Sequence, residues 1–379
     1  MTDPRMAAYH GAAIFDGTRL HHDKTLLVGE GVCRGILDRP PEGAEVIGLR
    51  GGVITPGFVD LQVNGGGGVM FNDQTTPEAI ATIAAAHATT GTAALLPTLI
   101  TDTPDRTRAA IAATEAAIDR GVPGVLGLHL EGPHLSLARK GAHDPALIRS
   151  MAPEDEALLI AAAARLPNLM VTVAPESVRP EQIARLVRAG VIVSLGHSDC
   201  SYETARACFA AGASAATHLF NAMSPLTSRA PGLVGAALDC GVSAGLIADG
   251  IHVHPATIRA ALAAKRGAGG LFLVTDAMST VGSEITEFTL NARRILRCEG
   301  RLTLSDGTLA GADLTMPRAL QVMMQQVGLD LAQALAMATA RPAALLRDPL
   351  GHGQIRPGQK LHALHYDPET GATRGLAGG

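Results

Sequence analysis

The segment Gly127–Pro133, GLHLEGP, decides how the rest of the chain is interpreted. An apolar run that starts at Gly124 ends abruptly at Glu131, and Gly132 and Pro133 then break the expected strand. A carboxylate at the end of a buried strand is costly unless a cation pairs with it or its pKa shifts. We therefore ask which cation Glu131 meets, and which other strand ends point to the same place.

The sequence around this segment repeats one pattern, an apolar strand followed by an alanine-rich helix, which is typical of parallel α/β proteins. We expect eight strands, at residues 54–63, 93–97, 125–130, 169–174, 191–195, 215–217, 243–248 and 271–275. We expect helices between them at residues 76–89, 107–119, 153–165, 180–189, 202–211 and 255–265. Eight such units over roughly 290 residues fit a (β/α)8 TIM barrel. The alternative is an open doubly wound sheet, which would gather its polar residues at one switch point.

Polar or titratable residues end all eight expected strands. In strand order they are Gln62 and Asn64, Thr98, Glu131, Glu176, His197, His218, Asp249 and His252, and Asp276. This regularity favours the barrel, and it predicts an active site on the face where the carboxyl ends of the strands meet.

The two ends of the chain have a different pattern. Residues 1–54 contain short alternating strands with a hairpin-type turn at Asp16-Gly17. This segment is too small to stand alone, so we expect it to pair with residues 352–379 in a small β-sandwich domain. The barrel would then span residues 55–351, with a β insertion near residues 288–308.

The composition excludes several classes of partner. The 379 residues include 31 basic and 35 acidic side chains, a net charge of −4, so no basic field attracts nucleic acid or a membrane surface. Aromatic residues make up only 3%, which is poor material for stacking bases and points to a ligand held by polar groups. No apolar stretch of about 18 residues predicts a membrane span. Five cysteines without a C-x-x-C pair are typical of reduced thiols in a cytoplasmic protein.

Three strand-end residues form a candidate metal site. His197 and His218 are 21 residues apart, about one strand-plus-helix unit, so they belong to adjacent strands. Together with Glu131 they make a His2Glu set, which leaves a fourth zinc position open for water. A lone histidine at a strand end is usually structural. Here three separate strands place possible ligands at the same end of the barrel, which favours a metal site.

Asp276 ends the last expected strand, where a carboxylate can act as general base and then return the proton to a leaving group. The structural alternative is a helix N-cap.

Arg229 lies in a loop after the sixth strand, where it could bind phosphate through bidentate hydrogen bonds or be an ordinary solvated charge. His129, close to Glu131, is expected to face the other side and pack against the helices.

The motifs taken together are similar to those of a known family. They are PGFVDLQVNGGGG, GLHLEGPHL, KGAHDP, VTVAPE, LGHSD, THLFNAM, PGLVG, IADGIHVH, LVTDAM and LAGADLTM. The set resembles the N-acetylglucosamine-6-phosphate deacetylases of the amidohydrolase superfamily, in family order over residues 55–316. The match at both ends of the chain is weaker.

The resemblance implies a role for each matching residue. Glu131, His197 and His218 would bind one divalent metal ion, with Zn2+ expected and Fe2+, Co2+ or Mn2+ as alternatives. Asp276 would be the general base and acid, and His143 would polarise the acetyl carbonyl. The expected substrate-binding set comprises Gln62, Asn64, Ala142, His143, Asn221, Ala222, Arg229, Asp249, His252, Leu309, Ala310 and Gly311. Arg229 would reach the neighbouring site in a homodimer.

One departure from the wider superfamily concerns the metal count. Many amidohydrolases carry H-x-H after the first strand, which holds a second metal, whereas this chain has Gln62 and Asn64. Neutral amides are weaker zinc ligands than imidazole, so we expect one tightly held metal ion and not two.

The expected activity is metal-dependent removal of the acetyl group from N-acetyl-D-glucosamine 6-phosphate, in amino-sugar catabolism or cell-wall recycling. One alternative is an N-acetylgalactosamine-6-phosphate deacetylase or a hydrolase of another N-acyl amine. The sequence does not separate the two sugar epimers, because an enzyme distinguishes them by only one or two hydrogen bonds. A second alternative, a non-catalytic sugar-phosphate-binding barrel, is disfavoured because the four residues of the metal and base set are all present.

Overall fold

The computed structural model describes residues 6–290 and 293–376. Its central feature is an eight-stranded parallel sheet in the order β17-β16-β15-β14-β13-β12-β11-β8. A parallel bridge between Val63 and Ala277 joins its two edges, so the sheet nearly closes into a barrel and the open-sheet alternative is wrong. The predicted (β/α)8 barrel is confirmed. The strands are β8 (Phe58–Val63), β11 (Thr92–Ile100), β12 (Leu128–Glu131), β13 (Leu169–Val173), β14 (Ile192–Leu195), β15 (Ala215–Ala216), β16 (Ser243–Leu246) and β17 (Leu271–Leu273).

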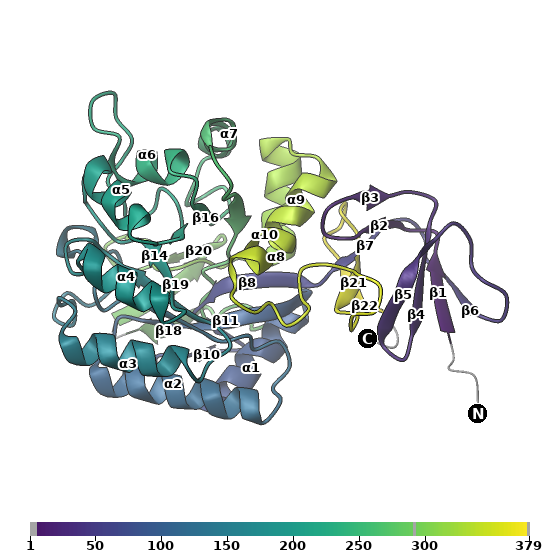
Figure 1. Cartoon of the computed structure of the whole chain (residues 1–379), viewed down its shortest axis with the longest axis horizontal. Coiled ribbons are helices and arrows are strands. Elements are labelled where there is room, and N and C mark those ends of the chain that lie inside the picture. The colour runs from purple at the N-terminus through teal and green to yellow at the C-terminus, as the bar shows by residue number, and fades with distance from the viewer. Residues whose placement is uncertain (1–5, 291–292, 377–379) are drawn as a thin grey trace.

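Helices surround the barrel strands (Figure 1). They are α1 (Pro77–Ala88), α2 (Pro104–Asp119), α3 (Pro153–Ala163), α4 (Pro180–Arg188), α5 (Tyr202–Ala210), α6 (Gly232–Asp239), α7 (Pro255–Ala264), α8 (Met316–Val322), α9 (Leu331–Ala338) and α10 (Ala340–Leu345), with a short 3-10 turn at Leu137–Arg139 and a π-helical turn at Met323–Val327. Proline in the first turn of α1 to α4 and of α7 fixes where these helices begin. None of the described helices is long and apolar enough to cross a membrane.

Helix α6 was not predicted from the sequence. Seven of its eight residues, Gly232 to Leu238, are buried, so it has no polar face to produce an amphipathic pattern. Its burial between neighbouring elements, not its own periodicity, stabilises it as a helix.

Two further sheets form the small domain beside the barrel, drawn in purple and yellow in Figure 1. One contains β5 (Val32–Leu37), β4 (Thr25–Gly29), β1 (Met6–His10) and β6 (Glu45–Gly48). The other contains β22 (Thr373–Gly375), β21 (Ala363–Tyr366), β7 (Val53–Pro56), β2 (Ala13–Phe15) and β3 (Leu20–His21). A cluster that includes Ile14, Leu26, Ile54 and Leu361 is its core. Residues 1–5 and 377–379 of the expected domain lie outside the described residues.

The strand expected at residues 54–63 is two strands, and this prediction was wrong. The chain leaves the small domain after β7 and enters the barrel at β8, with Gly57 between them. A Cβ atom at position 57 would lie 2.2 Å from Cβ of Ala93, so only glycine permits this close approach to β11.

An antiparallel sheet of β18 (Glu287–Leu290), β19 (Arg293–Cys298) and β20 (Arg301–Thr303) follows the barrel strands. Residues 291–292 of the expected insertion lie outside the described residues. The buried side chains of the sheet pack against Met70, Ile100 and Met278 at the carboxyl end of the barrel. The hairpin of β9 (Gly65–Gly66) and β10 (Val69–Met70) lies at the same end, directly after β8.

His129 lies inside the barrel, contrary to the prediction that it faces the helices. It is two residues from Glu131 on the same strand, and side chains two residues apart share one face of a strand. Its Nε2 lies 2.8 Å from the Thr172 hydroxyl, and its Nδ1 lies 3.0 Å from the carbonyl oxygen of Leu61. Thr98, expected at a strand end, belongs to the same interior layer, because β11 continues to Ile100.

Candidate metal centre and active site

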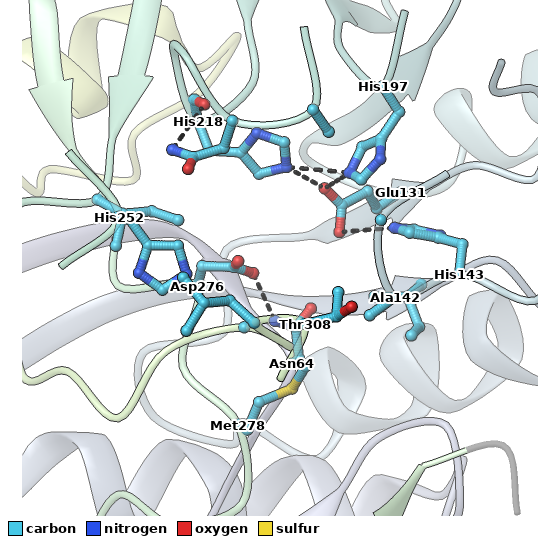
Figure 2. Close-up of a pocket in the computed structure, with 17 residues that line it drawn as sticks. Asn64, Glu131, Ala142, His143, His197, His218, His252, Asp276, Met278 and Thr308 are labelled. Atoms are coloured by element: carbon cyan, nitrogen blue, oxygen red, sulfur yellow. Dashed lines mark hydrogen bonds and ion pairs between the residues drawn. The ribbon is translucent and has the colours of Figure 1, made fainter. Parts of the chain in front are cut away.

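A cavity of about 260 Å³ opens at the carboxyl ends of the barrel strands. Figure 2 shows the side chains of Glu131, His143, His197 and His218 on one side and those of His252 and Asp276 on the other. Residues from β12 and from the segments after β14, β15 and β17 therefore meet at one place, although they lie far apart in the sequence.

Glu131, His197 and His218 converge on one point. Oε1 of Glu131 lies 3.0 Å from Nε2 of His218 and 3.3 Å from Nε2 of His197, and the two nitrogens lie 3.1 Å apart. Ligands of a tetrahedral zinc ion at about 2.0–2.1 Å from the metal are about 3.4 Å from one another. The three side chains thus have nearly the spacing that a single ion requires.

The hydrogen bond of His197 leaves a free lone pair at this point. Its Nδ1 lies 2.9 Å from the carbonyl oxygen of Arg139, which can only accept, so Nδ1 carries the hydrogen and Nε2 does not. A backbone carbonyl on the other ring nitrogen is the usual way in which proteins orient a metal-binding histidine. The donor set therefore fits a divalent ion.

The buried carboxylate and the neighbouring imidazoles affect the pKa values of Glu131 and His218. Burial tends to raise the pKa of Glu131, but the adjacent rings of His197 and His218 hold that pKa well below its usual range. Burial tends to lower the pKa of His218, but Glu131 and Asp276 raise it instead. The carboxylate is therefore ionised and available as a ligand.

Asp276 faces this group from the end of the last strand. Its Oδ1 accepts hydrogen bonds from Nδ2 of Asn64 at 2.7 Å and from Nε2 of Gln62 at 3.1 Å, and the same amide of Gln62 donates to Glu131 at 3.0 Å. Burial and the charge of Glu131 raise the pKa of Asp276 to about 6. A carboxyl group with such a pKa can take and return a proton near neutral pH.

His143 lies on the opposite side of the group. Its Nε2 is 3.8 Å from Oε2 of Glu131, and its Nδ1 is 2.7 Å from the hydroxyl of Thr101. Burial and the nearby His197 lower the pKa of His143 to about 3, so the ring is neutral. Because ligand atoms of Glu131, His143 and His197 lie within 4.8 Å of one another, these distances alone would also admit His143 as the third ligand in place of His218.

The backbone is strained where these side chains leave their strands. His197, His218 and Asp276 have positive φ angles of 47°, 29° and 51°, and Phe220 and Ala222 follow with 79° and 50°. Such conformations cost non-glycine residues on the order of 1–3 kcal/mol each and concentrate at functional sites. Their presence at three proposed catalytic or metal-binding positions supports a functional role for this end of the barrel.

Comparison with known proteins gives a consistent result. The Amidohydrolase family model matches residues 53–361. An N-acetylgalactosamine-6-phosphate deacetylase of Shewanella sp. (strain ANA-3) is 47% identical over 324 residues, 85% of this chain and 81% of the relative. An N-acetylglucosamine-6-phosphate deacetylase of Haemophilus influenzae is 36% identical over 329 residues, 86% of this chain and 85% of the relative.

A solved structure agrees with these relatives. The crystal structure of N-acetylglucosamine-6-phosphate deacetylase from Pasteurella multocida superimposes with a TM-score of 0.90 at 34% identity, covering 95% of both chains. The chain belongs to the amidohydrolase family.

Most of the expected substrate-binding residues of this amidohydrolase line the cavity. They are Asn64, Ala142, His143, Asn221, Ala222, His252, Leu309 and Gly311. Gln62 lies beneath it, bonded to Glu131 and Asp276. Asp249 does not line the cavity but accepts from Nδ1 of His252 at 2.6 Å, so it orients that ring.

Three strand-end or loop residues do not line the cavity. Ala310 packs in the core of the insertion sheet. Arg229 is exposed in the loop between β15 and α6. Glu176 is also exposed, and its carboxylate accepts from the hydroxyl of Ser198 and the backbone N–H of Asp199, so this strand-end carboxylate stabilises a loop.

Sequence reasoning missed several residues of this amidohydrolase's cavity. They are Ile100, Gly141, Ile247, Met278 and Thr308. Most are apolar, and an apolar residue at a strand end carries no chemical signal. Arg293 of β19 was also missed; its guanidinium donates to the carbonyl oxygen of Ala142 and so connects the insertion to the loop that carries His143.

Proposed function

We propose that this amidohydrolase removes the acetyl group from N-acetyl-D-glucosamine 6-phosphate to give glucosamine 6-phosphate and acetate. The observation that carries the proposal is the convergence of Glu131, His197 and His218 on one point with Asp276 beside it. The deacetylases among the relatives named above supply the substrate class.

One divalent ion, with zinc as the first candidate, is the cofactor that this proposal requires. Glu131, His197 and His218 would hold it, because their spacing and the lone pair of His197 suit a tetrahedral site. Gln62 and Asn64 stand where many amidohydrolases have two histidines, and neutral amides are weaker zinc ligands than imidazole, which supports a single ion and not a pair. When bound, such an ion acts as a Lewis acid that activates water and polarises the acetyl carbonyl.

The chain's own groups complete the hydrolysis. The carboxylate of Asp276 takes a proton from the attacking water while the new C–O bond forms at the acetyl carbon. His143 donates a hydrogen bond to the carbonyl oxygen as negative charge develops there. Asp276 then gives its proton to the nitrogen of the sugar as the C–N bond breaks, so that acetate and the free amine leave.

The sugar would occupy the rest of the cavity, against Ala142, Leu309 and Gly311, with Asn221, Ala222 and His252 toward the phosphate. Among the described residues that line the cavity, none is lysine or arginine. Arginine and lysine are the usual partners of a phosphate dianion. We therefore propose a homodimer in which the exposed Arg229 of one subunit completes the site of the other, in a protein of the cytoplasm that serves amino-sugar catabolism or cell-wall recycling.

The galactosamine epimer is the second candidate substrate. The observation in its favour is the 47% identity to an N-acetylgalactosamine-6-phosphate deacetylase. Acetate release from both N-acetylhexosamine 6-phosphates and from both unphosphorylated sugars, with metal-quantified protein, tests both proposals. The glucosamine substrate should have the highest kcat/KM. A higher value for galactosamine would transfer the assignment, and metal binding without acetate release from any of the four would indicate a non-catalytic barrel.

A further inference from the structure

Thr101, directly after β11, makes a set of contacts that no catalytic scheme above uses. The residue is 1% exposed. Its backbone N–H donates to Nδ1 of His143 at 3.3 Å, and its hydroxyl oxygen lies 2.7 Å from the same nitrogen. The hydroxyl also lies 3.4 Å from the carbonyl oxygen of Glu131.

These contacts determine which nitrogen of His143 carries the hydrogen. A backbone N–H can only donate, so the nitrogen that faces it must offer a lone pair. Nδ1 of His143 is therefore unprotonated, and the single hydrogen of the neutral ring lies on Nε2. The Thr101 hydroxyl has a single hydrogen, and it donates that hydrogen to Nδ1 at 2.7 Å rather than to the carbonyl oxygen of Glu131 at 3.4 Å, because the shorter contact is the stronger hydrogen bond.

Because Nε2 of His143 lies at the wall of the cavity, its hydrogen is directed into the cavity. Nε2 lies 3.8 Å from Oε2 of Glu131, and the ring of His143 meets that of His197 edge to face at 4.3 Å between centroids, at the wall of the cavity. A nitrogen that carries a hydrogen cannot coordinate a cation but can donate to an oxyanion. His143 is thus excluded as the third ligand beside Glu131 and His197, which leaves that place to His218.

We propose that Thr101 is a positioning residue that keeps Nε2 of His143 protonated and aimed into the cavity as a hydrogen-bond donor to the carbonyl oxygen of the substrate. The proposal rests on the proposed deacetylase function and deepens it. The same hydrogen bonds keep His143 from competing with His218 for the metal.

The fold makes room for the hydroxyl in a specific way. Gly132 has a φ of +90°, and a Cβ atom there would lie 2.2 Å from Oγ1 of Thr101. The glycine after Glu131 is therefore required by the hydroxyl as well as by the turn. Since threonine is branched at Cβ, its χ1 is restricted and its hydroxyl is held toward His143.

Two substitutions separate the hydroxyl from the shape of the side chain. Thr101→Val keeps the volume and removes the donor, and Thr101→Ser keeps the donor. In zinc-loaded protein we expect Thr101→Val to lower kcat about 10-fold with KM within a factor of about two, since the backbone N–H remains and loss of a full oxyanion donor costs about 100-fold or more. Thr101→Ser should restore kcat, and both variants should keep one metal ion. Thr114→Val is the matched control, because that buried hydroxyl bonds only the helix carbonyl of Ala110, and kcat should not change.

The tautomer itself is measured by long-range ¹H–¹⁵N spectra of histidine-labelled protein, with His143→Gln to assign the ring. The wild type should show the hydrogen on Nε2, and Thr101→Val should shift the population toward Nδ1. A hydrogen on Nδ1 in the wild type, an unchanged His143 spectrum in Thr101→Val, or loss of metal from that variant would overturn the role of Thr101. Absence of acetate release by the wild type would instead overturn the proposed function, while the spectra would still decide the role of Thr101.

Discussion

Nε2 of His197 lies 3.1 Å from Nε2 of His218, and both nitrogens face the same carboxylate oxygen of Glu131. Because Nδ1 of His197 donates its hydrogen to the carbonyl oxygen of Arg139, Nε2 of His197 carries a lone pair on the side that faces His218. Two imidazoles and a carboxylate at such distances are the donors that a zinc ion selects.

Metal content is the first prediction. The purified protein should hold one divalent ion per chain, and His218→Ala should lose it because only two of the three ligands remain. Removal by a chelator should also lower Tm, since a ligand present at about 100 times its Kd stabilises the native state by about 2.7 kcal/mol. Elemental analysis and thermal unfolding measure both effects.

The matched control is Glu176→Gln, which changes a strand-end carboxylate that lies outside the cavity and should leave metal content unchanged. Two ions per chain at neutral pH would contradict the argument from Gln62 and Asn64.

The second prediction concerns the general base. Asp276→Asn should keep the metal and the fold but lower kcat by about 10³-fold, because an amide cannot take the proton of water. Steady-state kinetics on protein of known metal content measure this. If the variant kept more than a tenth of the wild-type kcat, Asp276 would not be the proton carrier.

The third prediction concerns the phosphate. Arg229→Ala should raise KM for the 6-phosphorylated sugar by 10-fold or more, since a charged hydrogen bond contributes about 1.5–3 kcal/mol. KM for the unphosphorylated sugar should change little. Arg188→Ala, an exposed arginine of α4, is the control. Equal effects of Arg229→Ala on both sugars would remove the phosphate assignment.

The dimer can be tested with the same variant. When the Arg229→Ala chain is mixed with an Asp276→Asn chain, activity should return if each subunit completes the other's site. In such a mixed dimer the site of the Arg229→Ala chain keeps its own Asp276 and receives Arg229 from the other chain. Activity that stays at the sum of the separate variants would argue for sites that are complete within one chain.

The fourth prediction concerns Asp60, which is fully buried beneath the site. It accepts from the hydroxyl of Thr275 at 2.5 Å, and burial raises its pKa to about 7 from 3.8. The carboxyl group of Asp60 therefore binds a proton more tightly in the folded state than in the unfolded state. The resulting stabilisation of the folded state is complete below about pH 4 and is lost as the pH rises to about 7. Each unit of pKa difference corresponds to about 1.4 kcal/mol.

Replacing Asp60 with Asn should therefore cost less stability at pH 7 than at pH 4.5. The measurement is urea unfolding of metal-free wild type and variant at both pH values. A difference in unfolding free energy that is the same at both would show that Asp60 does not titrate in this range.

The amino-acid pattern alone predicts the repeating order of strand and helix, and with it the barrel and the face of the barrel on which the site lies. The reason is that apolar strands and the alanine-rich helices between them bury their apolar side chains by packing as a layer of helices against a sheet. The polar residue at each strand end identified Glu131, His197, His218 and Asp276, because parallel strands bring their carboxyl ends together.

The direction of each side chain beyond the end of its strand becomes visible only in the folded chain. Glu176 bonds to a neighbouring loop, and Arg229 is exposed outside the cavity of its own chain. His197, His218 and Asp276, in contrast, have a strained backbone that directs their side chains into the cavity. The contact between Thr101 and His143 joins residues 42 positions apart, so no local pattern records it. Side-chain direction beyond a strand depends on turn geometry and on neighbours from other strands, and these exist only in the folded chain.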